Sequence, residues 1–238
     1  MSKLDILAFG AHPDDVELSC SGTLLKYKDA GRSIGIIDLT AGELGTRGTK
    51  ETRREEAKQA GSILGLDIRE NLDLGDGWFE LNKENKLAVV SAIRAFKPEI
   101  IFANAVRDRH PDHGRGARLV RDACFLAGLS KVVTKRNGEI QDPWRPRHLF
   151  NYIQSNHITP DLVIDISNFQ AQKMKSVLAY KTQFFNPDSD EQETFISSKR
   201  FIDFIDARGR EMGGAIGAVY GEGFTTENPL SYDFNSLL

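Results

Sequence analysis

The sequence contains few cysteines and no long apolar run. Only two cysteines occur among 238 residues, Cys20 and Cys124, and neither has a second cysteine or a histidine at the spacing of a zinc finger. This scarcity excludes a disulfide framework and a cysteine-based structural zinc site. No segment approaches the roughly 20 apolar residues that a helix needs to cross a bilayer. We therefore expect two reduced thiols and no membrane-spanning helix.

An excess of charge of one sign and a secretion signal are also missing. The formal net charge is -3 at pH 7, which gives no reason to expect nucleic acid or an anionic membrane as partner. The chain enters a short strand-like run almost at once, without the longer apolar core and small-residue cleavage site of a signal peptide. The expected location is the cytoplasm.

The pattern of apolar residues predicts one α/β domain over residues 1–238. Short apolar runs alternate with amphipathic stretches, which is typical of βαβ units. We predict a Rossmann-like, doubly wound, mostly parallel sheet with helices on both faces. An eight-fold barrel is not favoured, because it would need eight such units and only four are visible.

The predicted elements follow from the period of the apolar residues. In the first half we expect strands at 4–10, 33–39, 68–72 and 100–103, and helices at 21–30, 50–64, 84–96 and 113–129. In the less regular second half we expect strands at 147–152 and 162–166, and helices at 168–180 and 194–212. The glycine-rich stretch 213–223 follows a helix rather than a strand, so we expect a flexible loop there.

Two segments are dense in histidine and aspartate. Residues 11–15 (AHPDD) follow the first predicted strand, and residues 109–113 (RHPDH) follow the fourth. In a doubly wound sheet of order 3-2-1-4, strands one and four are neighbours, and ligands bind beyond their carboxyl ends. We therefore expect the two motifs to meet. The alternative is that the aspartates cap helices and the histidines lie on surface loops. Either motif taken alone would be compatible with this alternative.

These residue types favour a metal site over a nucleophile. No serine or cysteine in either motif stands on the strand-to-helix elbow that exposes a nucleophile. Imidazole nitrogen and carboxylate oxygen suit Zn²⁺, and three protein ligands leave the fourth position to water, as in catalytic sites. We predict that His12, Asp15 and His113 bind the metal. Pro13 stiffens the turn between the first two ligands.

The remaining polar residues of the motifs are assigned to catalysis. Asp14 is predicted to act as general base toward the attacking water. His110 is then available to stabilise the developing oxyanion or to protonate the leaving nitrogen. Asp112 is expected to fix the tautomer of His110 by hydrogen bonding, and the alternative for Asp112 is a helix cap.

Taken together, these motifs resemble those of the LmbE-like (PIG-L) zinc deacetylases. The similarity extends through residues 40–48, 161–167 and 220–224, so it covers nearly the whole chain. It is strongest to the deacetylases of bacillithiol biosynthesis. The resemblance implies the same ligands and base, Zn²⁺ or another divalent metal such as Fe²⁺, and hydrolysis of N-acetylglucosaminyl malate to glucosaminyl malate and acetate. It also implies a homo-oligomer, often a hexamer.

The malate that this resemblance implies carries two carboxylates, which call for planar, bidentate cations. Arg109 adjoins His110, and Arg53 lies early in the second predicted helix. Both are candidates to bind the malate. The alternative for Arg53 is a solvated position on the helix, paired with Glu51 or Glu56.

Two other functions stay open. An amidase of bacillithiol conjugates, or a deacetylase of other N-acetylglucosamine derivatives, would use the same metal chemistry. A nucleotide-binding or sensory module would use the same sheet. Against the latter, the first turn has aspartates where the Gly-x-Gly-x-x-Gly fingerprint admits pyrophosphate. The expected partner is a small acetylated amino sugar, with no nucleic acid and no membrane.

Overall fold

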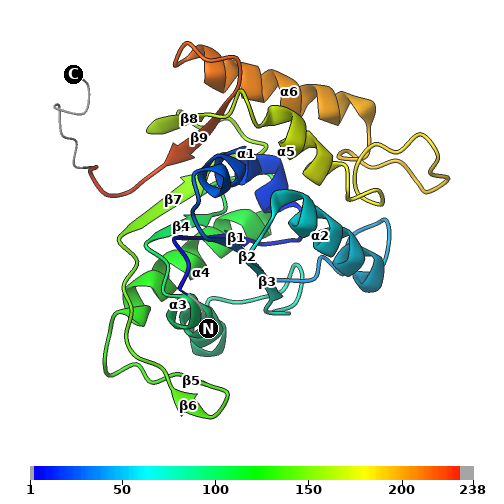
Figure 1. Cartoon of the computed structure of the whole chain (residues 1–238). Helices are drawn as coiled ribbons and strands as arrows, with labels where there is room; N and C mark the ends of the chain where they lie inside the picture. Colours follow the sequence, from blue (N-terminus) through cyan, green and yellow to red (C-terminus); the bar gives the residue numbers. More distant parts are fainter. Residues whose placement is uncertain (1–2, 231–238) are drawn as a thin grey trace.

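The computed structural model describes residues 3–230, and in this part of the chain seven strands form one sheet in the order β3-β2-β1-β4-β7-β9-β8 (Figure 1). The strands are β1 (Ile6–Gly10), β2 (Ile34–Asp38), β3 (Ile68–Asn71), β4 (Ile100–Ala103), β7 (His148–Tyr152), β8 (Leu162–Asp165) and β9 (Gly221–Thr225). β1 pairs in parallel with β2 and β4, and β3 and β7 extend the parallel sheet on either side. β9 runs antiparallel to both β7 and β8. The mostly parallel sheet and the predicted order 3-2-1-4 are confirmed.

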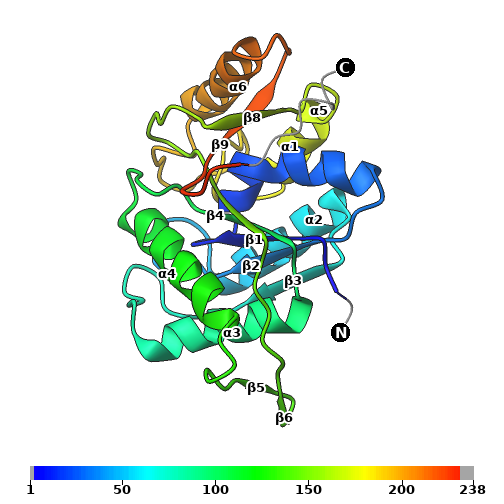
Figure 2. The ribbon, with the colours of Figure 1, turned by 90° about the vertical axis from the view of Figure 1, so that its left-hand side faces the viewer.

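Helices cover both faces of the sheet. They are α1 (Asp15–Asp29), α2 (Lys50–Leu64), α3 (Lys83–Phe96), α4 (Pro111–Ala127), α5 (Gln170–Val177) and α6 (Lys199–Gly214). α3 and α4 pack on one face, α1 and α2 pack on the other, and α5 lies against α1 and α2 (Figure 2). α6 packs against β8 and β9. The predicted doubly wound α/β architecture is confirmed.

α2 is bounded by local signals at both ends. The Thr49 side chain accepts a hydrogen bond from the amide of Thr52, and the Thr52 hydroxyl accepts one from the amide of Thr49. This reciprocal cap begins the helix. Gly65 ends it in the left-handed backbone region, with φ 65°. The predicted range 50–64 is therefore confirmed.

α1 begins six residues earlier than predicted, at Asp15 instead of residue 21. The polar residues between these positions were expected in a loop, but the structure buries most of them in the first turns of the helix. Glu17, for example, is fully buried and accepts hydrogen bonds from Arg69 at 2.6 Å and from the Tyr180 hydroxyl at 3.0 Å. These partners are distant in sequence. The predicted start of α1 was therefore wrong, because it was based only on the polarity of the residues that precede position 21.

The expectation of a flexible loop at 213–223 is wrong for its last residues, which begin β9. A Cβ on Gly221 would lie 2.7 Å from Val163 Cγ1, and one on Gly223 would lie 2.9 Å from the sulfur of Met212. The glycines therefore allow β9 to pass close to β8 and to α6.

A short hairpin of β5 (Lys135–Arg136) and β6 (Glu139–Ile140) projects from the body of the molecule and was not predicted (Figures 1 and 2). Asn137 and Gly138 at its turn both have positive φ, 52° and 84°. A two-residue type I′ turn requires this conformation. The Asn-Gly pair is the local signal that could have predicted the hairpin.

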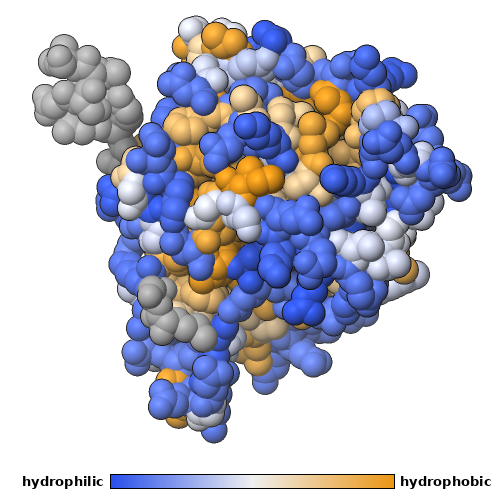
Figure 3. All heavy atoms as spheres, turned by 45° about the vertical axis from the view of Figure 1, so that its right-hand side comes forward, coloured by the Kyte–Doolittle hydropathy of each residue, from blue (hydrophilic) through white to orange (hydrophobic). Residues whose placement is uncertain are grey.

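Hydrophilic side chains cover much of the face shown in Figure 3, and apolar side chains gather across its upper half among them. Within the described residues, no helix is long and apolar enough to span a membrane. Cys20 and Cys124 are both free thiols, as expected.

Candidate metal centre

The two histidine- and aspartate-rich motifs meet at the carboxyl ends of the neighbouring strands β1 and β4. The first motif forms the turn from β1 into α1, and the second forms the turn from β4 into α4. The ring centroids of His12 and His110 lie 4.6 Å apart, and those of His12 and His113 lie 5.6 Å apart. The two motifs therefore share one site, although about a hundred residues separate them in sequence.

The three predicted metal ligands converge on one another. Asp15 Oδ1 lies 3.1 Å from His113 Nε2, and Asp15 Oδ2 lies 3.5 Å from His12 Nδ1. Ring nitrogens of His12, His110 and His113 also lie within 4.8 Å of one another. Atoms that bind one tetrahedral ion at about 2.0 to 2.2 Å are separated by distances of this order. The residues present therefore fit a divalent metal with nitrogen and oxygen ligands.

Each of the two histidines predicted as ligands also contacts a second carboxylate. His12 Nε2 lies 2.9 Å from Asp76 Oδ1, and His113 Nδ1 lies 2.6 Å from Asp108 Oδ2. Metal-bound histidines usually have such a partner, which fixes the ring orientation and the tautomer. Sequence reasoning missed both residues. Asp108 lies just before the second motif, and Asp76 stands between two glycines, but neither position has a spacing that indicates its partner.

These carboxylates make the site attractive to a cation. Burial acts to lower the pKa of His113, but Asp15 and Asp108 outweigh it and raise that pKa to about 9. A field that favours a proton on this imidazole also favours a metal ion beside it. The electrostatics therefore agree with the geometry.

The Asp15 carboxylate is also held by side chains that follow strands β4 and β7. Asn104, after β4, donates to Asp15 Oδ2 at 3.0 Å, and Gln154, after β7, donates to Asp15 Oδ1 at 2.9 Å. The main-chain amide of His12 donates to Asp15 Oδ2 at 2.9 Å. Neither Asn104 nor Gln154 was predicted. Both follow parallel strands, but neither has a spacing in the sequence that indicates Asp15 as its partner.

Asp14 has an unusual backbone and an unusual acidity. Its φ of 125° and ψ of -25° are rarely adopted by a residue with a side chain, and such strain is concentrated at functional sites. Burial raises the pKa of the Asp14 carboxyl, Arg53 lowers it and Asp15 raises it, which together give a pKa of about 7. A carboxylate with this pKa suits a general base near neutral pH.

The two predicted arginines both line the site pocket, in different ways. Arg53 is buried rather than solvated, and its Nη2 donates to the main-chain oxygen of Pro13 at 2.6 Å and to Asp14 Oδ2 at 3.1 Å. Glu56 instead binds Thr182. Arg109 is exposed, and its guanidinium lies 4.8 Å above the ring of Phe195.

Asp112 does not make the contact that was expected for it. Its carboxylate accepts hydrogen bonds from the amide of Gly77 at 2.8 Å and from Arg115 at 2.6 Å, and lies 3.4 Å from His12 Nε2. The main-chain amide of Asp112, not its carboxylate, donates to Nδ1 of His110 at 3.2 Å. His110 is the N-cap of α4, so its ring meets the amides of the first helical turn. The Asp112 carboxylate therefore supports His12 rather than His110.

The pocket beside these residues has a volume of about 210 Å³. Its apolar lining consists of Leu18, Leu44, Ile196, Phe201 and Ile205. Arg208 of α6 also lines it and was not predicted. The pocket thus combines the histidine- and aspartate-rich cluster with apolar and cationic walls.

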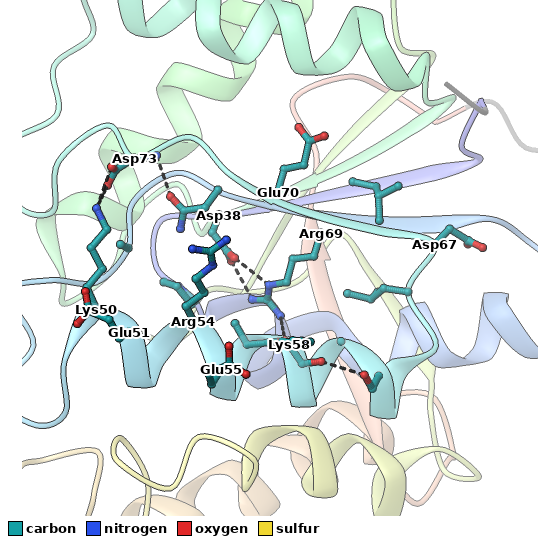
Figure 4. Close-up of a pocket in the computed structure, with 18 of the residues that line it drawn as sticks. Asp38, Lys50, Glu51, Arg54, Glu55, Lys58, Asp67, Arg69, Glu70 and Asp73 are labelled. Carbon is teal, nitrogen blue, oxygen red and sulfur yellow. Dashed lines mark hydrogen bonds and ion pairs between the residues drawn. The ribbon is translucent and has the colours of Figure 1, made fainter.

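A larger hollow of about 1090 Å³ lies along α2 and β3 (Figure 4). Two ion pairs join charged side chains of its lining: Lys50 contacts Asp73 at 2.7 Å, and Arg69 contacts Asp38 at 2.8 Å. No histidine or cysteine is found among the described residues that line it. This hollow therefore lacks the ligands of the metal centre.

Comparisons with known proteins connect the site to a family. Residues 7–124, which contain both motifs, match the PIG-L family, described as GlcNAc-PI de-N-acetylase. The chain is similar to the diacetylchitobiose deacetylase of Thermococcus kodakarensis, with 28% identity over 189 residues, 75% of this chain and 70% of that protein. It is also similar to the probable N-acetyl-α-D-glucosaminyl L-malate deacetylase 2 of Bacillus anthracis, with 23% identity over 199 residues, 75% of this chain and 81% of that protein.

Among solved structures, a conserved protein of Thermus thermophilus has a TM-score of 0.84 and 37% identity. The match covers 97% of this chain and 97% of that protein. The similarity therefore includes the second half of the chain, which lies beyond the segment matched to the family.

Proposed function

Because the chain belongs to the PIG-L (LmbE-like) family, we propose that it is a metal-dependent hydrolase that removes the acetyl group from an N-acetylglucosamine derivative. The observation that supports this most strongly is the convergence of His12, Asp15 and His113 beside the buried carboxyl of Asp14. We propose the first three as metal ligands and Zn²⁺ as the metal. These residues would hold a divalent ion, which when bound would activate a water molecule and polarise the amide carbonyl.

The protein's own groups would then move protons and stabilise charge. Asp14 accepts the proton of the attacking water, and Arg53 holds the Asp14 carboxylate toward the site. His110 faces the same space and donates to the developing oxyanion or to the leaving nitrogen. Asp112 holds the far nitrogen of His12 together with Asp76.

We propose N-acetylglucosaminyl malate as the substrate. The similarity to a probable deacetylase of that compound supports this choice, and so does the presence of Arg109 in the pocket lining, whereas Arg53 is engaged by Asp14. The similarity to a diacetylchitobiose deacetylase supports the broader class of N-acetylglucosamine derivatives. A carboxylate-bearing substrate and a neutral one therefore need to be compared directly.

The test is acetate release from N-acetylglucosaminyl malate, N-acetylglucosamine and N,N'-diacetylchitobiose by protein of measured metal content. We expect release in proportion to bound metal, and the highest kcat/KM with the malate compound. Asp14→Asn protein prepared in the same way measures any contaminating deacetylase. Equal kcat/KM for all three compounds would contradict the malate assignment, and no release from any of them would contradict the deacetylase function.

A further inference from the structure

Arg208 is a cation in the wall of the site pocket, and it forms no ion pair with the described residues 3–230. Its guanidinium donates to the main-chain oxygens of Gln154 and, at 2.9 Å, of Leu18. No carboxylate of the described residues 3–230 lies within ion-pair distance of it. Main-chain oxygens satisfy hydrogen bonds but supply no full counter-charge to this half-buried guanidinium. A guanidinium also has more donors than these two bonds use.

The nearest acidic groups are already occupied. Glu222 accepts from Lys173 at 2.6 Å and from two main-chain amides of α1. Asp108 contacts the ring of His113 at 2.6 Å. Burial lowers the pKa of Arg208 to about 10, so the side chain stays cationic at neutral pH. The positive charge is therefore available to a ligand.

Ser19 supplies a second unpaired group in the same wall. It lies on α1, one turn after Asp15, and is 4% exposed. Its hydroxyl has no hydrogen-bond partner within the described part of the chain. Ser19 and Arg208 both line the site pocket, and both also line a small hollow that adjoins it. A buried hydroxyl without a partner indicates a bound water or ligand that completes it.

From these two side chains we propose an anion subsite in the catalytic pocket, in which Arg208 and Ser19 together hold a carboxylate of the ligand. A carboxylate there would accept from the guanidinium and the hydroxyl at once. The other arginines are placed differently: Arg53 is bound to Asp14, and Arg109 is exposed. The subsite rests on the proposed deacetylase function, because the carboxylate is either a substituent of the substrate or the acetate that hydrolysis releases.

Direct titration tests anion binding without turnover. The metal-loaded protein is titrated with L-malate and separately with acetate, in the wild type, Arg208→Gln and Arg200→Gln. Arg200 is an exposed residue of α6, so its loss changes the net charge equally. We expect the Kd of at least one anion to rise at least tenfold in Arg208→Gln and to stay unchanged in Arg200→Gln. Equal Kd values in all three proteins, as binding to the metal alone would give, would overturn the subsite.

Ser19→Ala is the second variant, because Arg208 also ties α6 to Leu18 and Gln154 and its replacement by Gln could unfold the protein. Ser19→Ala removes only a hydroxyl that has no partner. We expect the Kd for the same anion to be roughly two- to tenfold higher than in the wild type, without a fall in Tm. An unchanged Kd in Ser19→Ala would overturn the two-residue site and assign a buried water to that hydroxyl.

Kinetics identify the source of the carboxylate. If it belongs to the substrate, Arg208→Gln raises KM for N-acetylglucosaminyl malate but not for neutral methyl N-acetylglucosaminide. If it belongs to the product, both KM values stay unchanged and inhibition by acetate weakens. An equal loss of kcat/KM with both substrates and unchanged acetate inhibition would show a structural role and overturn the subsite. No turnover by the wild type would contradict the proposed function but not the anion subsite, because the titrations still decide whether the anion binds.

Discussion

Asp108 provides a direct test of how the metal centre is held. Its Oδ2 lies 2.6 Å from His113 Nδ1, while its Oδ1 accepts from the amide of Asn156 at 2.6 Å. Asp108→Asn keeps the shape of the side chain but removes the charge that orients and polarises the imidazole. Loss of such a partner typically weakens metal affinity by about 10- to 100-fold, which corresponds to about 1.4 to 2.8 kcal/mol.

The assay is competition for Zn²⁺ against a chromophoric chelator, which gives the metal Kd of each variant. Asp142→Asn is the matched control, because the Asp142 side chain is 84% exposed and far less constrained. We expect a 10- to 100-fold rise in Kd for Asp108→Asn and no change for Asp142→Asn. We also expect activity of Asp108→Asn to recover in part at high Zn²⁺. A Kd within twofold of the wild type would refute the reasoning that this carboxylate positions His113.

Three further predictions follow from the site and from the two thiols. Asp14→Asn should retain metal and lower kcat by about 10²-fold or more, since Asn tolerates the positive φ but is no base; loss of metal would instead identify Asp14 as a ligand. Arg109→Ala should raise KM for the malate compound and leave that for a neutral substrate unchanged, and an unchanged KM would remove Arg109 from substrate binding. Burial raises the pKa of Cys124 to about 12 and that of Cys20 well above its usual value, so both stay protonated at pH 8. Neither should react with Ellman's reagent until the protein unfolds, and fast labelling of the folded protein would contradict this.

The sheet order and the convergence of the motifs could be predicted because they depend on patterns that the sequence displays directly. Buried parallel strands are continuous apolar runs, and the switch point follows from their order. α2 was predicted at its observed bounds because Thr49 can cap a helix there and the apolar residues that follow have helical spacing. His12, Asp15 and His113 were brought together by this topology, and their roles stay predictions.

The contacts that complete the site could not be read in this way. Asp76, Asn104, Gln154 and Arg208 come from four separate segments, and each acts through a partner that is distant in sequence. No periodicity or spacing connects such pairs. The misplaced start of α1 has the same cause, because its buried polar side chains are satisfied only by tertiary partners.

The position of β9 has a consequence for the order in which the strands join the sheet during folding. β9 is the last strand of the described chain, yet it lies between β7 and β8 and is the strand that joins β8 to the sheet. β8 therefore has no place in the sheet until nearly all of these residues have been synthesised, and such pairings form late because they are distant in sequence. The segment 7–124 carries every motif residue, but Gln154 and Arg208 come from the later part. A nascent chain can therefore contain all three proposed ligands before the later residues are made. It then still lacks the side chain that donates a hydrogen bond to Asp15 and the arginine that lines the pocket.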